Sequence, residues 1–410
     1  MYYYMNEHRS FAVLQEIALS ESIDFSAMEK ALAKTVKRFP YFMVEVAEIN
    51  GRLHYVHNEK PFLLARDRRK HSLRPADNNG YLIRVSIDGN KIHLYNLHCL
   101  TDGRGKLPFV KTLLNNYYAE IGIENDPPLD ERYRTIPDDL ALEYADPYAN
   151  LPKDVPVLEF FKTERPHFRL PVKKSSPLTS YTYCIMVKTD DLMRFAKSTN
   201  GTPNVVISSI LAKAILRVHP NALDGTDIKI DVIVDTKPSL GSMLSSISAY
   251  SAARLVYSDE LLKKDITGQH TSLREMLKFQ TTPDYMCMHA KNLQYAGDFL
   301  KTLPSMEARR AHADYIFGGF AGSATAGISY AGQSKLGSIS NHVKHIRAIV
   351  EPSLFDLLIE VNCPGNDFDI TITQSFESRI YVETMKEILD ELGIPYSDGD
   401  MMVSGYIPYL

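Results

Sequence analysis

The stretch of residues 82–117 constrains the fold most, because it changes from a strand pattern to a helix pattern within a few residues. Two apolar runs, 82–87 and 91–98, flank Asp88-Gly89-Asn90, a tripeptide typical of a β-hairpin turn. A polar segment, residues 101–105, follows the second run. Beyond it, apolar side chains recur at helical spacing. This order predicts a hairpin whose second strand leads directly into a helix, so the chain combines both kinds of element.

The same alternation of strands and capped helices is expected along the rest of the chain. Residues 11–19 have the composition of a strand, and Ser26 with Glu29 forms a capping-box pattern that opens a helix ending before Pro40. Asn50-Gly51 predicts a second hairpin, with strands at 42–46 and 53–56. In the second half we expect strands at 181–187, 228–234, 251–257, 327–330, 345–350, 357–362 and 368–374, and helices at 189–197, 204–218 and 381–392.

A chain of 410 residues predicts two domains or lobes. Residues 122–177 are rich in Pro and Asp and lack sustained periodicity, so we interpret them as a connector that packs against the surface. The expected division is an N-terminal lobe over 1–177, which includes the connector, and a C-terminal lobe over 178–410. No repeat of fixed period is present, and the predicted class is α/β or α+β with mixed sheets.

Composition excludes several classes of function. The 46 Lys and Arg residues are balanced by 50 Asp and Glu residues, and a general nucleic-acid binder would show a basic excess. No run of 18 apolar residues predicts a membrane span. The four cysteines are far apart and form no CxxC pair, which favours reduced thiols over zinc ligands or disulfides. The start of the sequence lacks a basic leader followed by an apolar core, so we expect a cytoplasmic protein.

The hexapeptide His98-Cys99-Leu100-Thr101-Asp102-Gly103 is the sharpest chemical signal. A histidine at the end of an apolar strand can project from a rigid scaffold into a cleft, where a general base must stand. Asp102 then suits a structural role, an ion pair that anchors the turn, and Gly103 would permit the backbone conformation of that turn. The structural alternative is that Asp102 only caps the next helix and His98 only bonds a neighbouring carbonyl. The motif alone leaves both interpretations open.

The region 82–114 resembles the motif region of the CoA-dependent acyltransferase superfamily. That superfamily includes chloramphenicol acetyltransferases, plant-type BAHD acyltransferases, alcohol O-acetyltransferases and the condensation domains of peptide synthetases. Its members carry HHxxxDG or HxxxD between a strand and a helix, as this sequence does at 98–103. The resemblance implies two chloramphenicol-acetyltransferase-like lobes, each a mixed sheet with helices, and a tunnel between them. It also implies that His98 is the general base and that Asp102 is structural.

The resemblance extends to residues 229–238, which are similar to a strand that ends in Val-Asp-x-Arg. The family arginine pairs with the motif aspartate, and Lys237 occupies its position here. Lysine cannot form the bidentate fork of arginine, but we still expect an ion pair with Asp102, with Arg84 as another possible partner. Leu97 replaces the first histidine of HHxxxDG. The second lobe, from Ile328 onward, is similar to bacterial alcohol O-acetyltransferase-like proteins; the plant-type DFGWG signature is absent, as is tryptophan.

This family likeness implies an acyltransferase that moves an acyl group from a thioester, acyl-CoA or an acyl carrier protein, to a hydroxyl or amine acceptor. No metal and no cofactor beyond acyl-CoA as co-substrate is expected. Ser329 is a candidate donor to the oxyanion. Two alternatives remain: a non-catalytic, condensation-like binding module that recruits a carrier protein or another partner, and an isomerising or cyclising condensation-type enzyme that uses the same histidine.

Three other features are given structural interpretations. Cys99 is expected to be an inert buried thiol. Residues 318–324 are rich in glycine but lack the lysine of a phosphate-binding loop, so we interpret them as a flexible crossover or lid between strands. His342 and His345 have no acidic residue in register, and we expect exposed histidines rather than metal ligands.

Overall fold

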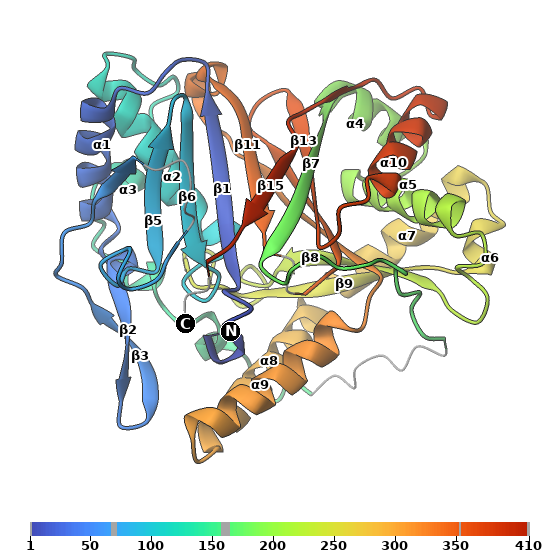
Figure 1. The fold of residues 1–410 in the computed structure, drawn as a ribbon, viewed down its shortest axis with the longest axis horizontal. Coiled ribbons are helices and arrows are strands. Elements are labelled where there is room, and N and C mark those ends of the chain that lie inside the picture. Colours follow the sequence, from blue (N-terminus) through green and yellow to red (C-terminus); the bar gives the residue numbers. More distant parts are fainter. Residues whose placement is uncertain (1, 67–71, 157–164, 352–353, 408–410) are drawn as a thin grey trace.

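A computed structural model describes residues 2–66, 72–156, 165–351 and 354–407. The chain forms two lobes side by side, each a β-sheet flanked by helices (Figure 1). Each sheet contains both parallel and antiparallel pairs. The predicted α/β (α+β) architecture with mixed sheets is therefore confirmed.

The first lobe is built on a five-stranded sheet, counted over the described residues, with strand order β11-β1-β6-β5-β4. Helices α1 (Phe25–Arg38) and α2 (Gly103–Glu120) share one apolar core with this sheet. Asp24, not the predicted Ser26, caps α1, because its side chain accepts the N–H of Ala27. The strands are β1 (Ala12–Leu19), β4 (Leu64–Arg66), β5 (Ile83–Asp88), β6 (Lys91–Leu97) and β11 (Val343–Val350). A separate hairpin consists of β2 (Val44–Ile49) and β3 (Arg52–His57).

The second lobe is built on a larger sheet with strand order β14-β7-β13-β12-β10-β8-β9, and β15 also pairs with β7. Its strands are β7 (Thr179–Lys188), β8 (Ile228–Asp235), β9 (Tyr250–Tyr257), β10 (Ala326–Gln333), β12 (Leu357–Cys363), β13 (Asp367–Gln374), β14 (Tyr396–Asp398) and β15 (Met402–Gly405). Residues of α5 (Pro203–Val218) and α10 (Ile380–Glu391) share its apolar core, and α4 (Thr189–Ser198) lies beside them.

Strand β11 ties the two halves of the sequence together. It lies in the second half of the chain but forms an edge of the first lobe's sheet, where Ile346 pairs with Ile17 of β1. The first lobe is therefore completed by residues more than 300 positions further along the sequence. The proposed boundary at residue 177 stays a prediction.

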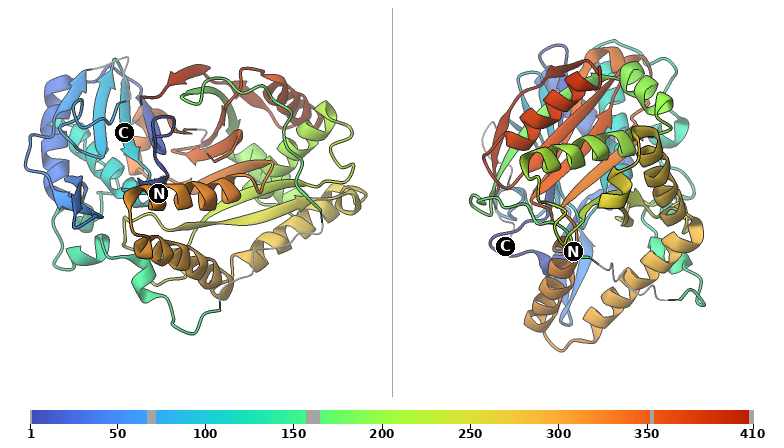
Figure 2. Two further views of the ribbon diagram at one scale, coloured as in Figure 1. Left: turned by 60° about the horizontal axis from the view of Figure 1, so that its bottom comes forward. Right: turned by 90° about the vertical axis from the view of Figure 1, so that its right-hand side faces the viewer.

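The region between β9 and β10 is helical, which the sequence patterns did not predict. It contains α6 (Asp259–Leu262), α7 (Ile266–Gln280), α8 (Pro283–Thr302) and α9 (Met306–Ala321). Helices α8 and α9 run along the lower side of the molecule (Figure 2). The interpretation of residues 318–324 as a crossover between strands was wrong for 318–321, because these residues are the last turn of α9.

The connector packs against both lobes where the structure describes it; for example, the N–H of Phe168 donates to the carbonyl of Asp227 in the second lobe. Residues 157–164 lie outside the described part. The connector contains α3 (Glu131–Arg134) and short 3-10 helices at Leu140–Glu143 and Pro147–Asn150. Buried Glu143 receives two hydrogen bonds from Arg38 of α1. This buried ion pair supports the prediction that the connector packs against the surface of the protein.

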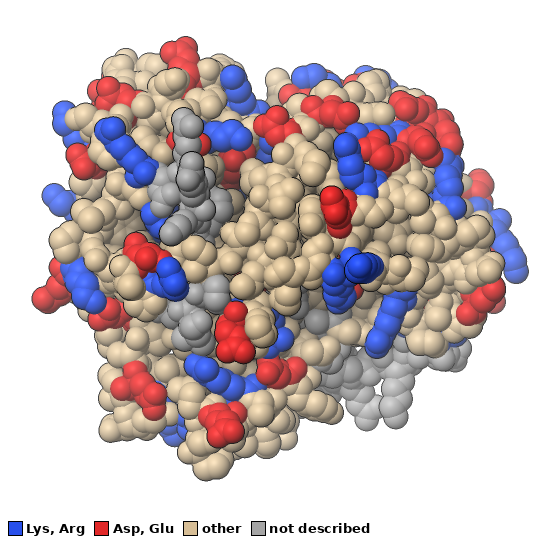
Figure 3. All heavy atoms as spheres, in the orientation of Figure 1, with Lys and Arg blue, Asp and Glu red and all other residues tan. Residues whose placement is uncertain are grey.

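The surface shows no segregation of charge on the face drawn in Figure 3, where acidic and basic side chains are interspersed. Among the helices that the structure describes, none combines the length and the apolar character needed to cross a bilayer.

Candidate active site

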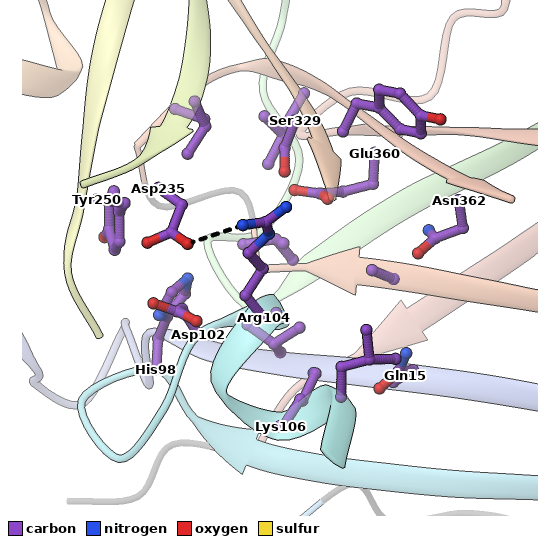
Figure 4. Close-up of a pocket in the computed structure, with 18 of the residues that line it drawn as sticks. Gln15, His98, Asp102, Arg104, Lys106, Asp235, Tyr250, Ser329, Glu360 and Asn362 are labelled. Carbon is purple, nitrogen blue, oxygen red and sulfur yellow. Dashed lines mark hydrogen bonds and ion pairs between the residues drawn. The ribbon is translucent and has the colours of Figure 1, made fainter. Parts of the chain in front are cut away.

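A cavity lies between the two lobes and reaches His98 (Figure 4). It encloses about 1300 Å³ of space, a volume that includes open solvent at its mouth. One wall comes from β1 and the junction of β6 with α2, and the opposite wall comes from β8, β10 and β12. Its polar lining residues include Gln15, His98, Asp102, Arg104, Lys106, Asp235, Ser329, Ser334, Glu351, Glu360 and Asn362.

His98 is the first residue after β6, and its position is set by main-chain and ring contacts. Its N–H donates to the carbonyl of Phe11 at 2.9 Å, which extends the pairing between β1 and β6 by one step. The imidazole stacks on the ring of Phe11, with centroids 5.3 Å apart, and lies 5.2 Å from the ring of Tyr250. The preceding Leu97 is buried in the apolar core. The side chain of His98 therefore faces the cavity while its neighbour anchors the strand.

The protonation state of His98 is controlled mainly by burial. Burial lowers the pKa of the ring to about 4, against a smaller raising effect from a hydrogen bond with its own backbone carbonyl and from the charge of Asp102. Ser248 donates to that same carbonyl at 2.7 Å, and its hydroxyl lies 3.5 Å from Nδ1. A neutral imidazole that donates from one nitrogen keeps a lone pair on the other. At neutral pH this ring can accept a proton.

Asp102 is both a helix cap and one half of a buried ion pair. Its Oδ1 accepts the N–H of Gly105 at 2.7 Å and so caps α2. Its Oδ2 accepts a hydrogen bond from Lys237 Nζ at 2.6 Å and another from the N–H of Ala249 at 3.2 Å. Because Lys237 and Ala249 belong to the second lobe, this carboxylate joins the lobes next to His98. The two interpretations left open for Asp102, a cap or an ion-pair anchor, are thus present together.

The conformational role expected of Gly103 was wrong. Gly103 does not adopt a positive φ, and a Cβ added there would meet no atom within 4 Å. Gly105 is the constrained glycine, since a Cβ there would lie 2.1 Å from the carbonyl oxygen of Ser246. The side chain of Thr101 also donates to that oxygen, at 2.6 Å. The motif needs a small residue two positions after Gly103, where the backbones of the two lobes touch.

Lys237 is 2% exposed and contacts Asp102, as expected from its place in the sequence. Arg84, the other possible partner, donates instead to the carbonyl of Ser72. A second ion pair joins the lobes beside the first, because Arg104 at the start of α2 contacts Asp235 at the end of β8, at 3.3 Å. Two adjacent charge pairs therefore cross this end of the cavity.

Ser329 lies on the wall opposite His98, on β10, as Figure 4 shows. Its neighbour in the parallel pairing of β10 with β12 is Glu360, which also lines the cavity. The surroundings of Glu360 raise the pKa of its carboxyl to about 7, mainly through loss of solvent, against smaller lowering effects of the Ser329 hydroxyl and the charge of Lys106.

Several lining residues were missed from the sequence. Glu360 and Asn362 alternate within the apolar strand β12, and two polar residues at this spacing in a buried strand were a usable signal for a polar cavity wall. Lys106, on α2, is 2% exposed and donates to Asn96, and burial lowers its pKa to about 8. Nothing in the pattern of α2 distinguished this lysine from a surface residue.

The structure gives no sign of catalysis or metal binding at two other residues considered from the sequence, Cys99 and His345. Burial raises the pKa of the Cys99 thiol, which disfavours a nucleophilic thiolate. The expectation that His345 is exposed was wrong: it is 8% exposed, and its Nε2 lies 3.0 Å from Glu16. Glu16 lies on β1, so the acidic partner of His345 is far away in sequence. No cluster of metal-ligating side chains is found in the described parts of the chain.

Among known proteins, this chain is similar only in fold, to a set of solved structures. No protein-family model matches the sequence, and no curated protein matches it. The structure of F. graminearum TRI101 complexed with coenzyme A and T-2 mycotoxin aligns with a TM-score of 0.60 at 13% identity, over 97% of this chain and 98% of the other. Polyketide synthase associated protein 5 from Mycobacterium tuberculosis aligns with a TM-score of 0.60 at 13% identity, over 94% and 96%.

The first condensation domain of the CDA synthetase aligns with a TM-score of 0.56 at 12% identity, over 93% of this chain and 90% of the other. The chain thus has the two-lobed fold that these proteins share, over nearly its whole length. The fold expected from the resemblance at residues 82–114 is confirmed.

Proposed function

We propose that this protein is an acyltransferase that moves an acyl group from a thioester donor to a hydroxyl or amine acceptor, with His98 as general base. The observation that carries the proposal is an imidazole kept neutral by burial at the wall of an open cavity between two lobes. The fold supports it, because proteins of this fold include one crystallised with coenzyme A and others that are condensation domains.

In the proposed reaction, His98 removes the proton from the acceptor as its oxygen or nitrogen attacks the thioester carbonyl. The resulting imidazolium then protonates the departing thiolate, so that no net proton is consumed. The tetrahedral intermediate carries a negative charge on the former carbonyl oxygen, and Ser329 is the proposed hydrogen-bond donor to it. Asp102, Gly103 and Lys237 stay out of the chemistry, and the ion pair of Asp102 with Lys237 holds the loop that carries His98.

The donor is acyl-CoA or an acyl carrier protein, and the acceptor is an alcohol or an amine. Acyl-CoA acts as a co-substrate, and the proposed chemistry uses no further cofactor and no metal. A non-catalytic module that recruits a carrier protein is the alternative. The observed site favours catalysis over this alternative, because recruitment does not require a neutral histidine beside an open cavity.

The proposal is tested by thiol release from a panel of acyl-CoAs mixed with primary alcohols and amines. His98→Ala should abolish the thiol release that the wild-type protein shows, a loss of at least about a hundredfold, the range for removal of a general base. Circular dichroism should show that the variant stays folded.

Cys99→Ala is the matched control, because it changes the adjacent residue and removes the thiol that could act as a nucleophile. This variant should keep its activity. Full activity in His98→Ala would contradict the proposal, and loss of activity in Cys99→Ala alone would point to a covalent mechanism through the thiol.

A further inference from the structure

Phe11 has a backbone conformation that a bulky residue rarely adopts. It lies directly before β1, and its φ of 48° is in the left-handed region. Such a conformation costs free energy, so it persists only where several contacts hold it, and it is found most often at functional sites. Phe11 is 2% exposed, and its ring stacks on the imidazole of His98. The strained residue is therefore in direct contact with the proposed general base.

Glu351 holds the chain on both sides of Phe11. It directly follows β11 and is 2% exposed. Both oxygens of its carboxylate accept the N–H of Ser10 at 3.0 Å, and its own N–H donates to the carbonyl of Ala12 at 3.2 Å. The hydroxyl of Ser10 also donates to the carbonyl of Ile407 at 3.3 Å. These contacts fix the residues before and after Phe11, so they impose the left-handed turn between them.

The imidazole of His98 is oriented by aromatic contacts more than by hydrogen bonds. The oxygens of Asp102 accept hydrogen bonds from α2 and from the second lobe, so this carboxylate does not hold the ring. Among the described residues, the one polar side chain within hydrogen-bond range of a ring nitrogen is Ser248, at 3.5 Å. The ring of Phe11, by contrast, lies nearly parallel to the imidazole, at an interplanar angle of 21°. Tyr250 contacts the imidazole as well, at a centroid distance of 5.2 Å.

We propose that Glu351 and Phe11 are positioning residues for His98: Glu351 holds the left-handed turn, and the turn lays the ring of Phe11 on the imidazole. The stacked ring fixes the plane of the imidazole and keeps water from one of its faces. Neither residue takes part in the proton transfer. For its effect on catalysis, this inference rests on the proposed acyl transfer.

The Phe11 ring should also influence the protonation of His98. Burial is the largest cause that lowers the pKa of His98 from 6.5 to about 4. Removal of a ring that covers the imidazole admits water, so the pKa should rise toward its ordinary value. The charges of Asp102, Lys106 and Lys237 act on His98 too, and the variants described below leave all three residues unchanged.

Phe11→Gly is the first test, because glycine adopts a positive φ without strain and only the ring is lost. The main-chain bond from His98 to residue 11 should therefore survive. In NMR titrations of histidine-labelled protein, with His98→Ala to identify the signal, the pKa of His98 should rise from about 4 toward 6.5. With acetyl-CoA and an acceptor selected by the thiol-release assay, kcat should fall by about tenfold or more, as expected for a misplaced catalytic group. An unchanged pKa, or a loss confined to KM, would overturn the inference.

Two conservative variants separate the length of Glu351 from its charge. Glu351→Asp keeps the charge but is too short to hold Ser10 in the same way, so it should raise the pKa of His98 and lower kcat. Glu351→Gln keeps an oxygen that accepts the N–H of Ser10 and should stay close to the wild type in both measurements. Because burial raises the pKa of Glu351 to about 7, kcat is compared at about pH 8, where this carboxyl is ionised. Loss of kcat in Glu351→Gln with full activity in Glu351→Asp would show that Glu351 acts through its charge, and the inference would be wrong.

A double variant tests whether Glu351 acts through Phe11. In the Phe11→Gly background, Glu351→Asp should change kcat by less than about twofold, because the ring that it positions is already absent. Two independent, fully additive losses would contradict the link. If Glu351→Asp does not fold, Glu351→Gln decides: a loss as large as that in Phe11→Gly would overturn the role of Glu351, and activity near that of the wild type would support it.

Glu16→Gln is the matched control for a general loss of stability. Glu16 is also a buried carboxylate of the first lobe, but its partners are Lys91, His93 and His345, not the turn at residues 10–12. The pKa of His98 should stay at about 4 in this variant. A rise as large as that in Phe11→Gly would show that any weakening of the lobe exposes His98, and the inference would fail.

The NMR titration needs no substrate, so it separates this inference from the proposed function. If His98→Ala keeps full activity while Phe11→Gly raises the pKa of His98, the proposed function fails and the positioning of the imidazole stands. If His98→Ala is inactive but neither Phe11→Gly nor Glu351→Asp changes that pKa, the inference alone fails.

Discussion

At the level of single residues, the start of α2 shows how one carboxylate can serve the helix and the contact between lobes at the same time. Asp102 accepts the N–H of Gly105 with one oxygen and the ammonium of Lys237 with the other. Both charged residues are at most 8% exposed. A buried charge that loses its partner is costly, whereas replacement of both charges can be nearly neutral.

Asp102→Asn tests this arrangement. Asparagine caps helices as well as aspartate does, so the cap should survive while Lys237 is left buried without its main counter-charge. The free energy of unfolding, measured in urea, should fall by about 3 to 5 kcal/mol. The double variant with Lys237→Met should be more stable than Asp102→Asn alone. A single variant as stable as the wild type would show that the pair contributes nothing.

The two glycines of the same turn should respond oppositely to alanine. Gly105→Ala places a Cβ against the Ser246 carbonyl, where backbone from each lobe meets. It should lower the free energy of unfolding by about 2 kcal/mol or more, as forced overlap in packed regions does. Gly103→Ala, the matched control, meets open space in the first turn of a helix and should be neutral or stabilising by up to about 1 kcal/mol. Equal effects in urea unfolding would contradict this assignment.

At the level of elements, Glu16 links three neighbouring strands of the first lobe. It lies on β1 and is 1% exposed. It contacts Lys91 and His93 of β6 on one side and His345 of β11 on the other, at 3.0 to 3.2 Å. Burial alone would raise the pKa of this carboxyl, but the hydrogen bonds from His345 and His93, together with Lys91, bring it well below its ordinary value of 4.5.

The sign of this shift predicts how Glu16 affects stability. Because the pKa of the folded state lies below the unfolded value, the stabilisation is complete above about pH 4.5 and is lost as the pH falls below it. Glu16→Gln should therefore be clearly less stable than wild type at about pH 7, and the difference should shrink below about pH 4. Thermal unfolding across this range measures it. Glu29→Gln, at an exposed position of α1, should show no such trend.

The sequence patterns predicted elements best where local signals agree. Asp88-Gly89-Asn90 and the apolar spacing after residue 105 correctly placed β5, β6 and α2. Helices α7 and α8 were missed although they carry local signals: Asp265 caps one, and Pro283 occupies the first turn of the other.

Other features could not be predicted from local patterns at all. The insertion of β11 beside β1 is a pairing across the whole chain, and strand composition does not specify a partner. The same holds for the pairing of Ser329 with Glu360, which depends on the register of two strands, and for the contact of His345 with Glu16. In the site, His98 was recognisable from its motif, whereas the opposite wall required the assembled sheet.

At the level of the whole molecule, the lobes share structure in two places. Strand β11 leaves the second half of the chain to complete the first lobe's sheet, and the Asp102–Lys237 and Arg104–Asp235 pairs join the lobes at the cavity. The cavity walls belong to different lobes, so separation of the lobes would take Ser329 and Glu360 away from His98. The geometry of the proposed reaction therefore depends on the junction as much as on either lobe.

This sharing predicts that the two lobes unfold together. If β11 detached, the first lobe would lose the edge strand of its sheet and expose buried residues such as Ile346 and Ile349. Because of this cost in free energy, we expect neither lobe to unfold while the other stays folded. Calorimetry should give one transition whose calorimetric and van't Hoff enthalpies agree, and tyrosine fluorescence and circular dichroism should follow the same curve. In Gly105→Ala, which strains the junction, the single transition should shift to lower temperature without splitting. Two resolved transitions in the wild type would show instead that the lobes are independent domains, and the cavity, whose walls come from both, would be lost when the first of them melts.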